Sequence, residues 1–447
     1  MKKMMKPASY LSILTTMFLM ILSLDGGAAV LTYPGLAPCA TTLQACINGA
    51  ASGDEIQIAT NNRINENLTL SKDITLTNAS GFSPKIGSAD ELVIKTITVE
   101  DPGSGITAHV TVSHINFENA RVQVSFSGDS GHSFSMQDCE LTNKIDNNND
   151  VGVELSLRVT STVLLKRNII RSSGSAISIY GSIDDGEVVQ VTIVNNELTG
   201  TTPIESYQGI QLRNNFKGIF NVDIQSNLIH DVGSCFCGGP GGITIAQNGQ
   251  GVWNVNLVNN TIANIVGGGA NLYVYPPSST GVLNLNFYNN TLTHGEDYGV
   301  FFPPLSSALV LNNDYNNTFN NTLNDEWGGY APGANDLAAD PLFVNLAMSD
   351  FTLQSESSLI NAGTATIPGV TLTEFDLSGN DRVVGVIDVG AFEAADDTDD
   401  TDGSTTDTLT DTFENGGGCQ LGTNTTGPYS LFLALGTLAV IRSLRRR

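Results

Sequence analysis

The sequence has few charged residues and, among these, little positive charge. Charged residues are 15% of the 447-residue chain, and 20 Lys and Arg stand against 45 Asp and Glu, a net charge of −25. Nucleic-acid binding needs a basic face to meet the phosphates, so this balance argues against a nucleic-acid partner. Leu, Ala, Glu and Lys show little periodic spacing in this sequence, which argues against helical bundles and coiled coils.

Several familiar catalytic motifs are also missing. The sequence has no Ser-His-Asp triad signature and no Gly-rich phosphate loop. Asp184 and Asp185 are adjacent, but they lack the Gly-His-Gly partner of polygalacturonase-like sites. A basic lyase groove is hard to build from 20 Lys and Arg. No single reaction is therefore indicated.

Turn-forming residues are abundant instead. The chain has 46 Gly and is rich in Asn, and both residue types favour turns. An all-β, turn-rich, acidic protein is the expectation. Cys39 and Cys46 flank one helical segment and could form a disulfide, which fits an exported protein. Of Cys139, Cys235 and Cys237, at least one is expected to be a free or buried thiol.

Both ends of the chain look like targeting segments. Residues 1–29 combine three Lys, a short apolar run and small residues, which predicts a signal peptide, with a membrane anchor as the alternative. Residues 394–415 are rich in Asp and Thr and predict an extended stalk. In residues 416–447, Gly418-Cys419 precedes an apolar run and three closing arginines. We expect an exported protein held outside the cytoplasm.

Residues 30–325 contain an internal repeat of 23 to 33 residues. One series aligns Val191-Thr-Ile-Val-Asn-Asn196 with later copies that place Asn227, Asn260 and Asn290 at the same position, and a weaker copy places Asn313 there. A second series of alternating apolar residues shares this period: Val153-Glu-Leu, Ile177-Ser-Ile, Ile210-Gln-Leu, Ile243-Thr-Ile, Leu272-Tyr-Val and Val300-Phe-Phe.

Such units are too short to close a core alone, so they must stack strand on strand. The prediction is an all-β, right-handed parallel β-helix. The recurring Asn is expected to take a left-handed turn conformation and to bond up the stack. Residues 41–50 place Leu43, Cys46 and Ile47 on one helical face, which predicts a short helix capping the N-terminal end.

Residues 326–393 carry a more specific pattern: Asp340-Pro-Leu-Phe, Asp350-Phe, Asn361-Ala-Gly, Asp376, Gly379, Arg382 and Asp388-Val-Gly-Ala-Phe-Glu393. This pattern resembles the choice-of-anchor Q domain, which implies a small C-terminal β domain on a surface-anchored bacterial β-helix protein. The end of the chain resembles tripartite bacterial sorting tails with a Gly-Cys, which implies processing at Cys419 and attachment to the bacterial envelope. An ordinary single-span anchor is the alternative.

The outward positions of the second series could bind sugars. Aromatic rings stack on sugar faces, and polar side chains bond hydroxyls or carboxylates. The predicted ligand-binding residues are Glu154, Tyr180, Gln211, Arg213, Tyr273, Tyr275 and Phe301. The alternative is that these rings bind no ligand and merely stiffen the surface of the sheet.

Loops expected to enter the same face carry catalytic candidates, namely His230, Asp231, His294, Glu296 and Asp297. Asp146, Asn148 and Asp150 could hold Ca²⁺ or form a plain polar turn, and no other cofactor is indicated. Two functions follow. One is a non-catalytic surface rod that binds a polysaccharide or cell-surface glycan. The other is a polysaccharide lyase, hydrolase or epimerase.

Overall fold

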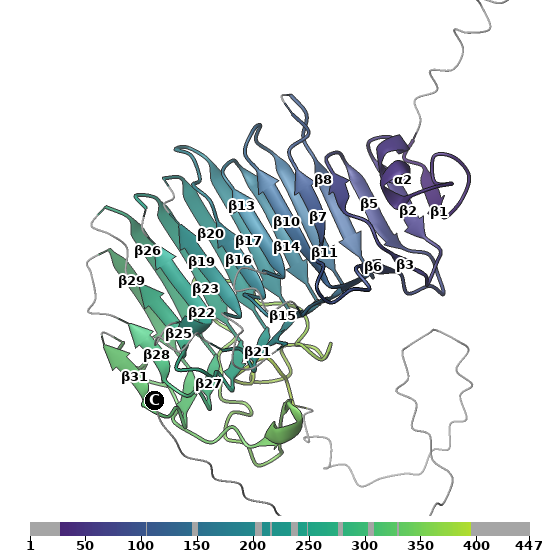
Figure 1. Ribbon diagram of the computed structural model, residues 1–447. Helices are drawn as coiled ribbons and strands as arrows, with labels where there is room; N and C mark the ends of the chain where they lie inside the picture. The colour runs from purple at the N-terminus through teal and green to yellow at the C-terminus, as the bar shows by residue number, and fades with distance from the viewer. Residues whose placement is uncertain are drawn as a thin grey trace, which may run out of the picture. The chain divides into compact units, whose positions relative to one another are not determined.

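The computed structural model describes residues 27–103, 105–144, 151–201, 208–214, 217–233, 240–247, 249–275, 280–302, 308–328 and 330–394. In this described part, three parallel sheets of 11, 10 and 10 strands wind around one core, and a two-stranded antiparallel sheet follows (Figure 1). The predicted all-β parallel β-helix is confirmed. No helix of the described residues is long and apolar enough to cross a membrane.

Each coil passes through the three sheets in the order A, B, C. Sheet A, in spatial order, is β1 (Val30–Tyr33), β2 (Asp54–Ile58), β5 (Ile74–Asn78), β8 (His109–Ser113), β11 (His132–Gln137), β14 (Ser161–Lys166), β17 (Val188–Val194), β20 (Ile219–Gln225), β23 (Val252–Val258), β26 (Val282–Tyr288) and β29 (Leu309–Asp314). Sheet B is β3 (Arg63–Ile64), β6 (Lys85–Gly87), β9 (Asn116–Glu118), β12 (Glu140–Asn143), β15 (Ile169–Ser172), β18 (Glu197–Gly200), β21 (Leu228–His230), β24 (Thr261–Ala263), β27 (Thr291–Thr293) and β30 (Asn317–Phe319).

Sheet C is β4 (Leu68–Leu70), β7 (Lys95–Glu100), β10 (Ala120–Phe126), β13 (Val153–Leu157), β16 (Ile177–Tyr180), β19 (Ile210–Asn214), β22 (Pro240–Gln247), β25 (Ala270–Tyr275), β28 (Tyr298–Phe302) and β31 (Asn324–Gly328). The core lies between the sheets and takes every second residue of a strand, as strand geometry requires. Ile224 and Leu257 are buried there.

The N-terminal end is covered by helix α2 (Leu43–Gly49) (Figure 1). Thr42 caps the helix, because its side chain accepts a hydrogen bond from the backbone N–H of Ala45. Leu43, Cys46 and Ile47 are buried on one face, so the predicted capping helix is confirmed. Cys46 is disulfide-bonded to Cys39.

A ladder of buried asparagines runs through the turns between sheets A and B. Asn227 accepts two hydrogen bonds from Asn196 at its Oδ1, and Asn260 and Asn290 continue the same pattern. Two details of the prediction were wrong. The next member is Asn316, because Asn313 pairs with Phe287 in the sheet. The left-handed backbone belongs to the residue before each ladder Asn, such as Asn195 and Asn259.

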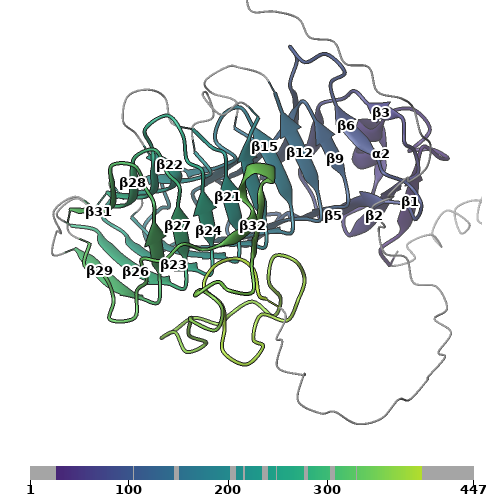
Figure 2. The same cartoon turned by 90° about the horizontal axis from the view of Figure 1, so that it is seen from below.

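These left-handed residues hold the C-terminal segment, residues 330–394. Asn195 donates to the carbonyls of Phe375 and Asp376, Asn259 to that of Asp388, and Asn289 to that of Thr364. Figure 2 shows this yellow-green segment running beside β23 and β24. The segment contains β32 (Phe343–Asn345), a short 3₁₀ helix η1 (Leu346–Met348) and β33 (Asp350–Leu353), with β32 and β33 antiparallel.

Four motif residues of the C-terminal segment form a buried cluster of ionisable side chains, namely Asp376, Arg382, Asp388 and Glu393. Arg382 is fully buried, lies 3.2 Å from a Glu393 oxygen and donates to the carbonyls of Gly390 and Ala391. Asp376 and Asp388 are also buried and accept backbone N–H groups. Burial, together with the charge of Asp388, raises the pKa of Glu393 to about 8. These residues therefore fix the loops of the segment.

Candidate functional site

The outward row of sheet C that the sequence predicts is a straight line in the structure. The pairing register aligns Glu154, Ser178, Gln211, Thr244, Tyr273 and Phe301 on successive strands. Gln211 accepts a hydrogen bond of 3.1 Å from the Ser178 hydroxyl, while Thr244 is buried. Arg213 is exposed and aligns with Ala246 and then Tyr275.

Four rings gather at the C-terminal end of this row. The Tyr273 ring lies 4.5 Å from Tyr275 and 4.4 Å from Phe301, and it is nearly parallel to the latter. Tyr298 adds a ring 5.4 Å from Phe301. We call Tyr273, Tyr275, Tyr298 and Phe301 the aromatic cluster. Burial, with a hydrogen bond to Tyr275, raises the pKa of Tyr273, so the Tyr273 hydroxyl stays protonated at neutral pH.

Tyr180 does not belong to this cluster. It aligns with Ser156 in β13, and its hydroxyl donates to Glu154, which also accepts a hydrogen bond from Gln123. Burial and the Glu154 carboxylate raise the pKa of Tyr180 to about 12. The predicted aromatic strip is therefore two separate groups: one tyrosine that is tied to a carboxylate, and the cluster.

Asp297 is the catalytic candidate nearest to the aromatic cluster. It immediately precedes β28, and its charge contributes to the raised pKa of Tyr273. Its Oδ1 atom is buried and has no hydrogen-bond partner among the described residues. Burial raises the pKa of this carboxyl group. A half-buried carboxyl beside stacked rings could act as a general acid.

The His230–Asp231 pair lies elsewhere, on the outer side of sheet B. The Nδ1 atom of His230 is 2.7 Å from an Asp231 oxygen, and its ring packs 5.1 Å from Phe351 of the C-terminal segment. Burial lowers the pKa of His230, but its hydrogen bonds to Asp231 and Glu197 outweigh this effect and raise the pKa overall. The pair is covered by the C-terminal segment and does not face the aromatic cluster.

His294 and Glu296 have local structural contacts. His294 follows β27 in a left-handed conformation, and its Nδ1 atom lies 2.7 Å from the Thr293 hydroxyl. Burial lowers the pKa of His294. Glu296 accepts a hydrogen bond from the backbone of Gly267. Both residues stand in the turn that leads from sheet B to β28, and their contacts hold that turn.

Some predicted residues lie outside the described part of the chain: Asp146, Asn148, Asp150, Cys235, Cys237 and Cys419. Within the described residues, no group of three or more His, Cys, Asp and Glu side chains could hold a metal ion. Cys139 is described, and it is a buried free thiol. Burial raises its pKa to about 12, so it is unreactive at neutral pH.

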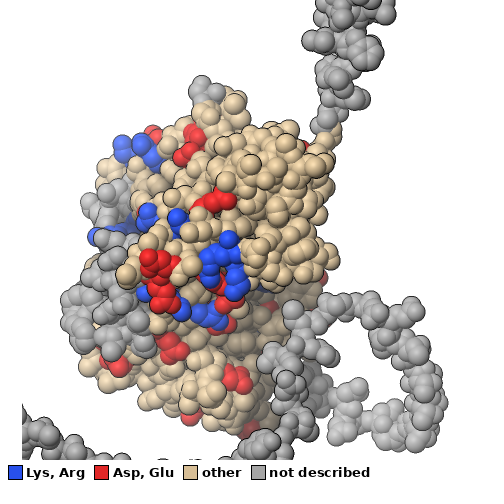
Figure 3. Space-filling view, turned by 45° about the vertical axis from the view of Figure 1, so that its right-hand side comes forward, with Lys and Arg blue, Asp and Glu red and all other residues tan. Residues whose placement is uncertain are grey.

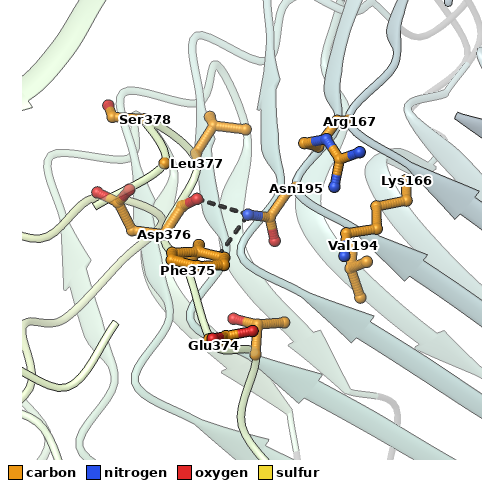
Figure 4. A pocket seen from close by; sticks show the side chains of 11 residues that line it. Lys166, Arg167, Val194, Asn195, Glu374, Phe375, Asp376, Leu377 and Ser378 are labelled. Atoms are coloured by element: carbon orange, nitrogen blue, oxygen red, sulfur yellow. Dashed lines mark hydrogen bonds between the residues drawn. The ribbon is translucent and has the colours of Figure 1, made fainter. Parts of the chain in front are cut away.

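Two hollows are lined by polar and charged residues that the sequence analysis did not propose as site residues. One, of about 390 Å³, includes Arg63, Lys85 and Glu118, and both cations bond Glu118. Figure 3 shows Lys and Arg next to Asp and Glu on an otherwise uncharged face. The other, of about 300 Å³, lies where Asn195 holds Phe375 and Asp376 (Figure 4). These residues pair with one another, which indicates structural roles.

Comparison with known proteins adds little to this site. No family model matches the chain, and no curated protein matches it. Among solved structures, the "Crystal structure of pectate lyase Pel9A" aligns with a TM-score of 0.38 and 15% identity, over 82% of this chain and 97% of that chain. The resemblance of residues 326–393 to the choice-of-anchor Q domain therefore stays a prediction.

Proposed function

We propose that the protein is an exported, surface-anchored rod that binds a polysaccharide or cell-surface glycan at the aromatic cluster without cleaving it. The observation that carries this proposal is the grouping of Tyr275 and Phe301 around Tyr273, with centroid distances from the Tyr273 ring of 4.5 and 4.4 Å, on two adjacent strands of a packed sheet. Rings held by a packed sheet lose little freedom on binding, and their faces suit sugar rings.

Export and anchoring rest on the two ends of the chain. The proposed signal peptide of residues 1–29 directs the chain out of the cytoplasm, and the tail of residues 416–447 attaches it to the bacterial envelope near Cys419. The acidic stalk of residues 394–415 separates the β-helix from the anchor. The chain's net charge of −25 keeps nucleic acids away.

A second candidate function is supported by Asp297. Its raised pKa and its closeness to Tyr273 suit a carboxylic acid that protonates a leaving oxygen during polysaccharide cleavage. Hydrolysis commonly needs a second carboxylate in reach of the same bond. Glu296 is bonded to the backbone of Gly267, so it does not supply that group, and the binding function is preferred.

The test compares two variants in a glycan-array screen and a polysaccharide-degradation screen. The double variant Tyr273→Ala/Tyr275→Ala should lose binding of at least one glycan that the parent binds on the array, while Tyr180→Ala, which changes an exposed tyrosine of the same sheet, should keep it. Melting temperatures should stay within a few degrees of the parent for both, because outward side chains contribute little to the core. Binding of every such glycan by the double variant at parental affinity would refute the site.

The degradation screen distinguishes glycan binding from polysaccharide cleavage. For a binding protein, the parent and Asp297→Asn should release no oligosaccharides from any polysaccharide that the array identifies. Release of products by the parent, lost in Asp297→Asn with binding retained, would establish the enzyme instead. Asn keeps the shape of the side chain but cannot donate the acidic proton.

A further inference from the structure

A second array of polar side chains covers the outer face of sheet A. On four successive strands the register aligns Gln190, Asn221, Asn254 and Asn284, and two residues further along these strands it aligns Thr192, Asp223, Asn256 and Asn286. Asn312 of β29 extends the second row. The strands β17, β20, β23, β26 and β29 lie side by side in Figure 1.

Hydrogen bonds between coils hold these side chains in place. Asn284 donates to Asn254 and Asn254 to Asn221, with distances of 2.7 and 2.8 Å. In the second row, Asn312 donates to Asn286 and Asn286 to Asn256, with distances of 3.0 and 2.8 Å. An amide has two N–H donors and one accepting oxygen with two lone pairs, so these contacts use only half of its capacity.

The two rows line a groove of about 500 Å³. The C-terminal segment also lines the groove, through Pro368, Gly369 and Thr371. The carbonyl of Thr371 accepts a hydrogen bond from the side chain of Gln225, the last residue of β20. Figure 2 shows the C-terminal segment beside β23. The groove therefore has a flat amide floor with a wall along one side.

The groove is nearly free of charge. Among its lining residues Asp223 is the one ionisable side chain, and that carboxylate accepts hydrogen bonds from both Gln190 and Asn256. An anionic ligand would find no cation among these residues, and a cationic ligand would find a single, already bonded carboxylate. A ligand with many neutral hydroxyl groups matches this floor best.

We propose that this groove binds a neutral, unbranched polysaccharide lying along the β-helix axis. Successive coils are about 4.8 Å apart, close to the length of one sugar unit, so each sugar meets a fresh pair of side chains. In β23 and β26 both members of the pair are amides. Five strands present this face, a span of roughly 19 Å between the first and the last at that spacing. The site is independent of the aromatic cluster, which lies on sheet C.

The test measures the affinity of neutral hexasaccharides of β-1,4-glucan, β-1,4-mannan and β-1,4-xylan, with hexagalacturonate as the anionic comparison, by titration calorimetry. The variant Asn254→Ala/Asn284→Ala removes hydrogen bonds to the ligand, so the affinity for the bound neutral sugar should fall about ten-fold or more. The isosteric variant Asn284→Asp should weaken binding as well, because it loses the N–H donors without changing the shape.

The control variant Thr111→Ala/Ser135→Ala changes two outward residues of sheet A, aligned in β8 and β11, outside the groove. It should bind like the parent, and so should Tyr273→Ala/Tyr275→Ala. No binding of any neutral hexasaccharide at millimolar concentration would overturn the proposal. Tighter binding of hexagalacturonate, or loss of binding in the tyrosine variant alone, would overturn it too, and the latter result would leave the aromatic cluster as the glycan site.

Discussion

Replacing Asn260 by Val tests how much the buried ladder contributes to stability. The Asn260 side chain makes four hydrogen bonds: it donates to the Ile224 carbonyl at 2.8 Å and to Asn290 at 3.0 Å, and it accepts from the backbone and side-chain N–H groups of Asn227 at 3.1 and 3.0 Å. Val removes all four bonds, and it leaves the Ile224 carbonyl and the Asn227 backbone N–H buried without these partners.

The expected loss follows from this count. At about 1 kcal/mol for each neutral hydrogen bond, the free energy of unfolding should fall by about 4 kcal/mol. The matched control is Asn254→Val on the preceding strand. Asn254 also makes two amide bonds to neighbouring coils, but it is half-exposed, so water can replace them and the loss should stay below about 1 kcal/mol.

Urea unfolding followed by circular dichroism measures both variants against the parent, with the midpoint and slope fitted together. A loss in Asn260→Val no larger than that in Asn254→Val would refute the reasoning. It would mean that the Ile224 carbonyl and the Asn227 backbone N–H form other hydrogen bonds when the ladder is interrupted.

Three further outcomes are expected. Ile224→Asp should not fold, because it places an unpaired charge at a fully buried position, and an unchanged thermal melt would contradict the inward assignment. Burial raises the pKa of Glu393 to about 8 from an ordinary value of 4.5, so the folded protein keeps a proton that the unfolded chain releases as the pH rises. The parent should therefore lose stability relative to Glu393→Gln between about pH 4.5 and pH 8; parallel pH profiles would argue against a protonated Glu393. Deleting residues 416–447 should release the protein into the medium, and retention on cells would count against the anchor.

The parts of the fold that depend on periodicity could be predicted from the sequence. Alternation of apolar residues identified the buried sides of β16, β19 and β25, because a strand places successive side chains on opposite faces. The shared period also gave the register of Glu154 with Tyr273 across the three intervening strands β16, β19 and β22, since stacked strands of one series must pair.

The site was harder to predict, because residues that are close in sequence can face different sheets. His230 ends β21 in sheet B and packs under Phe351, more than 100 residues further along the chain. Repetition within the β-helix carries no signal for that contact. The sequence signal for the amide rows of sheet A is the alternation of Asn254 and Asn256, and of Asn284 and Asn286, with the buried Val255 and Leu285.

The turn between sheets A and B has a constant length from β17 onwards, and this length determines which residue joins the ladder. Two residues separate β17 from β18, β20 from β21, β23 from β24 and β26 from β27, and the same is true of β29 and β30. The first of these residues takes the left-handed conformation and faces the C-terminal segment, while the second joins the buried ladder. A shift of the ladder to Asn313 would place that residue inside β29, so the fixed turn length selects Asn316. The connections from sheet B to sheet C vary in length instead, and Asp297 stands in one of them, beside the aromatic cluster. The ladder therefore keeps one edge of the coils from β17 to β30 constant, while the connections at the opposite edge vary in length.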